Sequence, residues 1–352
     1  MPSRIGTYAF LAARLRTRIG KLLPDERLEE VAKAATVDEA LLALRGTRYE
    51  RLAEPWNATG DLRAVEAALR SMEIDMHAEL RRDREEPIRS FIDALAQRLE
   101  AANLKDALRL WFDARVRGGD VSVRSGYLHR DAIVHPLDLD AVLAAEDAEG
   151  LAAALAGTPY AAAVAAEAGK AMAAGSLFEL ELALDRLHFR LLFDAVKGLG
   201  PVDRKVAERQ VGFEVDLTNL AWLVRFRAYG GMDAAGALSR LIPWGAPVDA
   251  RTVSEAWETG NLSEAVGGML GARGLEVLAG SAGNELSRLA LIERALRELG
   301  LLEARKLLSG DPFTIGVVLA YLRLERDEMA RVRAGLGAAR YGTGAARARE
   351  AS

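Results

Sequence analysis

Residues 43–49 read Ala-Leu-Arg-Gly-Thr-Arg-Tyr, and residues 154–160 read Ala-Leu-Ala-Gly-Thr-Pro-Tyr. The two tyrosines of this shared pattern, Tyr49 and Tyr160, lie 111 positions apart (160 minus 49). A seven-residue pattern that returns in this way predicts a repeated structural unit of roughly a hundred residues.

Two further patterns return with nearly the same period. The sequence arginine, apolar residue, arginine ends four predicted helices, with its first arginine at Arg14, Arg115, Arg225 and Arg331. The sequence apolar-Glu-x-Ala-Leu places its glutamate at Glu66, Glu181 and Glu293. Three patterns that share one period favour a triplicated unit over coincidence.

We therefore predict three homologous helical domains, at residues 1–100, 101–217 and 218–334. Each has a size that can bury its own hydrophobic core. The third copy lacks the Gly-Thr-x-Tyr sequence and has diverged. Residues 335–352 are rich in glycine and alanine and show no apolar period, so we predict a mobile C-terminal tail.

The hydrophobic pattern along the chain is that of helices. Apolar residues return at intervals of three and four, as at Leu62, Val65 and Leu69, and long alternating runs of β-branched residues are missing. Glycines such as Gly118 and Gly300 follow apolar-periodic segments and predict helix ends. The predicted fold class is all-α.

The composition argues against several classes of protein. The 352 residues contain no cysteine, which excludes disulfides and thiolate metal sites and favours a cytoplasmic location. The 47 basic and 51 acidic residues nearly balance, so we do not expect nucleic acid as a partner. No uncharged apolar run approaches the roughly 18–20 residues of a membrane span, and the N-terminus lacks the apolar core of a secretory signal.

Motifs for catalysis or cofactor binding are not found in the sequence. The phosphate-binding loop Gly-x4-Gly-Lys-Ser/Thr is absent, because Val164 stands where the loop ending at Gly169-Lys170 would need its first glycine. His129 and His135 flank Asp131, but two imidazoles alone make a poor metal site, and solvated loop histidines are the alternative. We expect no catalytic residue, no cofactor, no metal ion and no direct nucleotide binding.

The repeated arginines have two interpretations. They either complement the negative ends of helix dipoles or form a basic surface for a partner protein. The candidates for partner binding are Arg14, Arg16, Arg115, Arg117, Arg225 and Arg227.

The repeated glutamates Glu66, Glu181 and Glu293 lie beside apolar stripes of their predicted helices. A carboxylate in such a place needs a partner or a path to water. We expect at least two of them to be mostly buried and paired with an arginine or a backbone N–H, so that Glu181→Ala costs about 3 kcal/mol of stability. The alternative is a role in handling protons.

With these motifs, the chain resembles the C subunit of archaeal and bacterial V/A-type rotary ATPases, the counterpart of the d subunit of eukaryotic vacuolar ATPases. The resemblance covers nearly the whole chain and rests on order, length and triplication. Its most specific segment is Asp311-Pro312-Phe313-Thr314-Ile315-Gly316. The other segments that carry it are residues 8–16, 213–220 and 321–325 and the Asn-Leu pairs at 103–104 and 219–220.

This resemblance implies three helical domains arranged as a funnel around a pseudo-threefold axis. The narrow end would rest on the membrane ring of ion-binding subunits, and the wide mouth would receive the central shaft, made of the D and F subunits. Such a non-catalytic rotor component is attached to the membrane peripherally and couples ATP hydrolysis or synthesis to ion transport. The alternative is an unrelated all-helical adaptor or scaffold, for which a repeat of roughly 35–45 residues would be typical.

Overall fold

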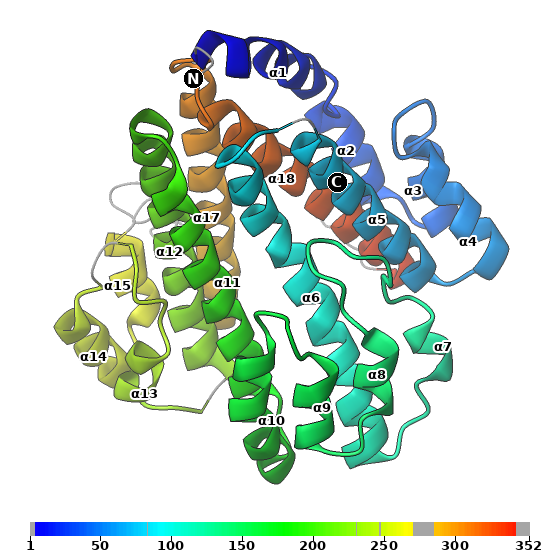
Figure 1. Ribbon diagram of the computed structural model, residues 1–352, viewed down its shortest axis with the longest axis vertical. Coiled ribbons are helices and arrows are strands. Elements are labelled where there is room, and N and C mark those ends of the chain that lie inside the picture. The colour runs from blue at the N-terminus through cyan, green and yellow to red at the C-terminus, as the bar shows by residue number, and fades with distance from the viewer. Residues whose placement is uncertain (1–3, 83, 230, 246–247, 270–284, 343–352) are drawn as a thin grey trace. The chain divides into compact units, whose positions relative to one another are not determined.

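A computed structural model describes residues 4–82, 84–229, 231–245, 248–269 and 285–342. Every regular element in these ranges is helical, which confirms the all-α fold class (Figure 1). None of the described helices has the length and apolar character needed to cross a membrane. The elements are α1 (Arg4–Ile19), α2 (Asp25–Lys33), α3 (Val37–Ala43), η1 (Glu50–Leu52), α4 (Ala53–Thr59), α5 (Leu62–Arg81), α6 (Ile88–Arg117), α7 (Ser122–Ser125), α8 (Leu139–Ala144), α9 (Ala148–Ala154), α10 (Ala161–Ala174), α11 (Phe178–Gly198), α12 (Pro201–Tyr229), α13 (Ala234–Ser239), α14 (Ala250–Thr259), α15 (Leu262–Met269), α17 (Glu285–Leu308) and α18 (Gly316–Arg340).

Several helices begin at side chains that satisfy their first backbone N–H groups. Aspartate is the N-cap of five helices, and its carboxylate accepts a hydrogen bond from the first turn. The five are Asp61, Asp138, Asp147, Asp233 and Asp249. These caps fix where α5, α8, α9, α13 and α14 start, because each supplies an acceptor that the helix itself lacks.

Glycine has two different roles at helices α6 and α17. Gly118 ends α6 with a left-handed φ of 68°, as predicted. The predicted helix end at Gly300 is wrong, because this residue lies inside α17. A Cβ atom at Gly300 would come within 2.3 Å of a terminal nitrogen of Arg323. The missing side chain therefore leaves room for the Arg323 guanidinium beside α17.

The chain divides into two compact units. Unit 1 comprises residues 1–17 and 200–324, and unit 2 comprises residues 18–199 and 325–352. The predicted boundaries after residues 100 and 217 fall inside the continuous helices α6 and α12, so neither is a linker. Helix α18 continues to Arg340 and buries Leu336 and Ala339, so residues 335–340 are not part of a tail. The rest of the predicted tail, residues 343–352, lies outside the described residues.

Two hydrophobic cores lie among the described residues of unit 2. In the first, side chains of α2, α3, η1 and α5 pack against the last part of α18. Tyr49, Leu69 of α5 and Leu336 of α18 belong to this core. In the second, α6 packs with α8 to α11, which lie beside it in Figure 1, around residues such as Trp111 and Tyr160. Each tyrosine of the repeated Gly-Thr-x-Tyr motif is fully buried in one of these cores.

In unit 1, helix α1 is tied to segments far away in the sequence. The Tyr8 hydroxyl donates to Asp203 Oδ2 at 2.8 Å, and Asp203 Oδ1 accepts the Ile315 backbone N–H at 2.8 Å. Arg16 donates to the carbonyl of Leu308, the last residue of α17, at 2.8 Å. Most of α1 therefore belongs with α12 and α17, although the sequence predicted it as part of a domain ending at residue 100.

A buried histidine in unit 2 is surrounded by charges. His77 on α5 is 3% exposed, and its neighbour Glu73 is 5% exposed and forms an ion pair with Arg98 of α6. Burial and the positive charges of Arg98 and Arg326, opposed by Glu73, lower the pKa of His77 to about 3. Burial works against the charged form of Glu73, but Arg98 and Arg326 outweigh it and lower the pKa of that carboxyl.

We expect His77 to make unit 2 sensitive to acid. The unfolded chain takes up a proton at His77 near pH 6.5, whereas the folded protein does so only near pH 3. The neutral side chain therefore contributes stability that is complete above pH 7 and is lost as the pH falls toward 3. Between pH 7 and pH 5 the wild type should lose about 2 kcal/mol more than His77→Gln, measured by urea unfolding at each pH. Equal losses in the two proteins would contradict this.

Candidate functional site

Glu100 lies in the middle of helix α6, and its side chain is 1% exposed. Its carboxylate accepts the backbone N–H groups of Val134 at 2.8 Å and His135 at 2.6 Å. It also lies 2.7 Å from His135 Nδ1 and accepts the Tyr160 hydroxyl at 2.9 Å. Burial, with Glu100 beside it, raises the pKa of Tyr160, so that the hydroxyl keeps its proton. One carboxylate thus holds both the loop before α8 and the tyrosine of the second repeated motif.

Glu328 on helix α18 makes the same kind of contacts with the first motif. It accepts the Tyr49 hydroxyl at 2.7 Å and an N–H of Arg48 at 2.6 Å. It also accepts the backbone N–H of Leu23, in the loop before α2. Arg48 forms a second ion pair with Glu325, one turn earlier on α18. The first motif therefore docks onto α18, at the other end of the chain.

A third carboxylate, Asp216, holds the corresponding place on helix α12. A Cβ atom on Gly245, in the loop before α14, would lie 2.3 Å from Asp216 Oδ1, so loop and carboxylate are in close approach. One turn later, Asn219 exchanges two hydrogen bonds with the backbone of Ile242, at 3.0 and 2.9 Å. Asn103 exchanges two with the backbone of His129 in the same way, at 2.7 and 3.0 Å.

We call Glu100, Asp216 and Glu328 the helix carboxylates. The residue four positions after each is buried, and these residues are Leu104, Leu220 and Val332. In each case the carboxylate is next to a loop that precedes a short helix. This arrangement aligns α6, α12 and α18 residue by residue.

The alignment corrects the predicted register of the arginines. Arg109 and Arg225 stand nine positions after Glu100 and Asp216, so Arg225 is equivalent to Arg109 and not to Arg115. Arg109 makes two bonds to Glu181, at 2.6 and 2.8 Å, and Arg225 bonds Glu293 at 2.7 Å. The error arose because the pattern of arginine, apolar residue and arginine occurs at different turns of the two helices, at Arg115 in α6 and at Arg225 in α12.

The three repeated glutamates are half-buried and not mostly buried as predicted, but the predicted pairing with an arginine is found for Glu181 and Glu293. The side chains of Glu181 and Glu293 are 25% and 37% exposed, because both stand at the edge of the apolar stripe. The Glu66 side chain has no hydrogen bond or ion pair within the described ranges. Gly337 stands on α18 where the other two copies have an arginine.

We expect Glu181→Ala to cost about 0.5–1 kcal/mol, less than the 3 kcal/mol expected for a buried pair. Solvent reaches both partners of the pair with Arg109, and such pairs contribute little. Urea unfolding of Glu181→Ala and of Glu181→Gln checks this value. A loss above about 2 kcal/mol in both variants would show that the carboxylate is shielded from solvent after all.

The six candidate arginines have different environments in the structure, and four of them lie in unit 1 while two lie in unit 2. Two donate to backbone carbonyls, one forms an ion pair, two lie over aromatic rings, and one has buried nitrogens without a hydrogen-bond partner among the described residues. The donors to carbonyls are Arg16, to Leu308, and Arg115, to Ala144, and the ion pair joins Arg225 to Glu293. Arg117 lies over the ring of Phe112 and Arg227 over that of Trp257. The arginine with buried nitrogens is Arg14.

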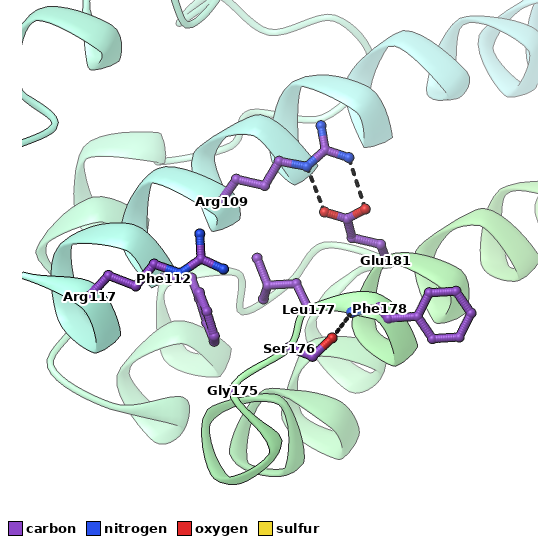
Figure 2. A pocket seen from close by; sticks show the side chains of 8 residues that line it. All are labelled: Arg109, Phe112, Arg117, Gly175, Ser176, Leu177, Phe178 and Glu181. Carbon is purple, nitrogen blue, oxygen red and sulfur yellow. Dashed lines mark hydrogen bonds and ion pairs between the residues drawn. The ribbon is translucent and has the colours of Figure 1, made fainter. Parts of the chain in front are cut away.

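A hollow of about 360 Å³ lies in unit 2 between the end of α6 and the start of α11. Figure 2 shows the Arg109–Glu181 pair along one side and Arg117 with Phe112 along another. The remaining lining residues are Gly175, Ser176, Leu177 and Phe178. The hollow brings together Arg117 and Glu181 from the sequence prediction, and adds Arg109, which the sequence analysis missed.

The helix carboxylates were also missed, although the sequence carries a signal for two of them. Glu100 and Asp216 stand three positions before the two Asn-Leu pairs that mark equivalent helices. Of the two loop histidines, His135 bonds Glu100, and no group of three or more metal-ligating side chains is found among the described residues.

Comparison with known proteins places these features in context. The family model described as ATP synthase (C/AC39) subunit matches residues 11–351. A protein from Methanocaldococcus jannaschii that is named as the C subunit of A-type ATP synthase is 23% identical over 340 residues, covering 94% of this chain and 82% of the relative. Proteins of the same name from Methanothermobacter thermautotrophicus and Pyrococcus horikoshii are 22% and 23% identical to this chain. Each alignment covers 92% of this chain, and it covers 81% of the first relative and 84% of the second.

Proposed function

The chain belongs to the ATP synthase (C/AC39) subunit family, and from this premise we propose that it is the central-rotor subunit of a V/A-type ATPase or synthase. In this role it is a socket that joins the central shaft, made of the D and F subunits, to the ion-binding ring in the membrane. Torque passes through it, so that ATP hydrolysis or synthesis is coupled to ion transport. The socket is itself non-catalytic, binds no cofactor or nucleic acid, and is held at the cytoplasmic side of the membrane by the complex.

The observation that carries this proposal is the threefold recurrence of the helix carboxylates. Glu100, Asp216 and Glu328 each lie against a loop at the same register of a long helix. This recurrence supports three homologous helical domains, and three similar domains around one axis would suit a socket for a shaft.

The same contacts supply the stiffness that a torque-bearing socket needs. Glu100 and Glu328 are buried and accept several hydrogen bonds each, and buried polar networks that are fully satisfied hold one arrangement rigidly. The domains proposed here are not those predicted from the sequence, since the helix of the first motif is α18. We propose that residues 20–81 with α18, residues 88–198, and residues 201–308 are the three copies.

Binding to the proposed neighbours tests this function. The purified chain should form a stable complex with the D–F pair and, separately, with the detergent-solubilised membrane ring, as measured by size-exclusion chromatography. An adaptor outside the rotor would bind neither of them. If the chain binds neither the D–F pair nor the ring of the same organism, the proposal is overturned.

A cross-link distinguishes a rotating subunit from a stationary one. The chain has no cysteine, so a single introduced cysteine can be linked to one introduced in the D subunit of the shaft. ATP-driven ion transport should continue after this link, because both proteins turn together. Loss of transport on linking to the shaft would place the chain on the stationary part of the complex.

A further inference from the structure

We propose that the hollow between α6 and α11 is the docking site for a segment of a neighbouring synthase subunit that places one carboxylate beside apolar side chains. This rests on the proposed function for the neighbour, but the site itself follows from the residues that line it. The segment would insert its apolar side chains against Phe112 and Leu177 and set its carboxylate against Arg117.

The apolar part of the site is exposed in the isolated chain. Phe178, at the start of α11, lines the hollow and is 39% exposed. Leu177, which is half-buried, and Phe112, which is 3% exposed, line the hollow as well (Figure 2). Contiguous apolar groups at the surface, with polar groups around them, are typical of places where another protein binds.

The charges of the hollow favour an acidic partner. Glu181 is already satisfied, because Arg109 donates to both of its oxygens at 2.6 and 2.8 Å. Arg117 lies with its guanidinium 5.5 Å from the centre of the Phe112 ring and has no carboxylate partner within the described ranges. The lining therefore carries a net positive charge, which one carboxylate of the partner would neutralise.

Arg117 is also the member of the arginine set that breaks the repeat. Arg115 is committed to the Ala144 carbonyl, and Arg225 is committed to Glu293. Counted from Asp216 as Arg117 is counted from Glu100, the corresponding residue is Asp233, which lies beyond the end of α12 and caps α13. A feature found in one copy and not its equivalent can fix the orientation of a single asymmetric partner on a repeated protein.

Charge reversal tests the polar half of the site. Arg117→Glu should weaken binding of the D–F pair or of the solubilised ring by about tenfold or more, measured by isothermal titration or biolayer interferometry. The matched control is Arg227→Glu, since Arg227 also lies over an aromatic ring, at 5.7 Å from Trp257, and is not among the lining residues. Affinities for both probes that are unchanged in Arg117→Glu would overturn the proposal.

Chemical protection tests the occupancy of the site. Ser176 lines the hollow and is exposed, so Ser176→Cys provides the sole thiol of the chain. A maleimide should label it readily in the free chain and at least tenfold more slowly in the assembled complex. Ser122→Cys, at an exposed position on α7, is the control and should keep its rate of labelling. Equal labelling rates of the Ser176→Cys variant in the free and assembled states would contradict docking in this hollow.

These outcomes separate the two proposals. If the wild-type chain binds neither the D–F pair nor the ring, the proposed function fails. If the wild type binds, but Arg117→Glu binds equally well or Ser176→Cys is not protected, the docking site alone fails.

Discussion

Glu100→Ala is expected to lower the free energy of unfolding by about 3–5 kcal/mol. The substitution leaves the Val134 and His135 N–H groups and the Tyr160 hydroxyl without their acceptor, and each buried group that loses its partner costs about 1–3 kcal/mol. Removing the side chain from a core position adds a cavity. Urea or guanidinium unfolding, followed by circular dichroism, measures the loss.

Graded variants show which part of this cost comes from the hydrogen bonds. Glu100→Gln keeps the shape and one acceptor oxygen, so it should cost less than Glu100→Ala. Tyr160→Phe removes a single bond and should cost about 1–2 kcal/mol. Glu146→Ala is the control, because this exposed residue before α9 should change stability by no more than about 0.5 kcal/mol. A Glu100→Ala protein as stable as the Glu146→Ala protein would mean that the loop and the motif do not depend on the carboxylate.

The sequence was sufficient to predict the fold class, because helices leave a periodic pattern of apolar residues. Helical spacing of apolar residues needs no tertiary information. The recurrence of Gly-Thr-x-Tyr also identified a real structural element, since Tyr49 and Tyr160 both bond a buried glutamate on a long helix. What the motif could not reveal is its partner, because Glu328 lies 279 positions after Tyr49.

The errors in the candidate site have the same physical origin. An arginine near a helix end looks alike whether it bonds a carbonyl, as Arg115 does, or a carboxylate, as Arg225 does. The register is fixed only by the packing of each long helix against its own neighbours, and that packing depends on contacts between distant segments. The half-burial of Glu181 could not be predicted for a related reason, because a position at the edge of an apolar stripe can be covered or left open by the neighbouring helix.

Arg48→Met is expected to destabilise unit 2 by about 3–5 kcal/mol, because it removes one positive charge that pairs with two buried carboxylates. Arg48 pairs with both Glu325 and Glu328, whose side chains are 2% and 4% exposed. Breaking a buried ion pair by removing one partner costs this much, since the remaining charge stays in a poorly solvated place. Arg45→Met is the control, because Arg45 is 75% exposed and lies 3.9 Å from Glu50, and it should cost no more than about 0.5 kcal/mol.

The second copy of the motif indicates how this loss can be reversed. Pro159 stands at the position of Arg48, and Gln97 on α6 stands at the position of Glu325, so this copy has neither the arginine nor the second glutamate. Glu100 bonds its tyrosine there, whereas in the first copy the Tyr49 hydroxyl donates to Glu328 and accepts from Arg48. Adding Glu325→Gln to Arg48→Met should therefore restore at least half of the lost stability, and the two substitutions should be strongly non-additive in a double-mutant cycle. If the two losses simply add, Arg48 does not balance the charge of Glu325. The occurrence of Arg48 with Glu325 in one copy, and of Pro159 with Gln97 in the other, would then have no energetic basis.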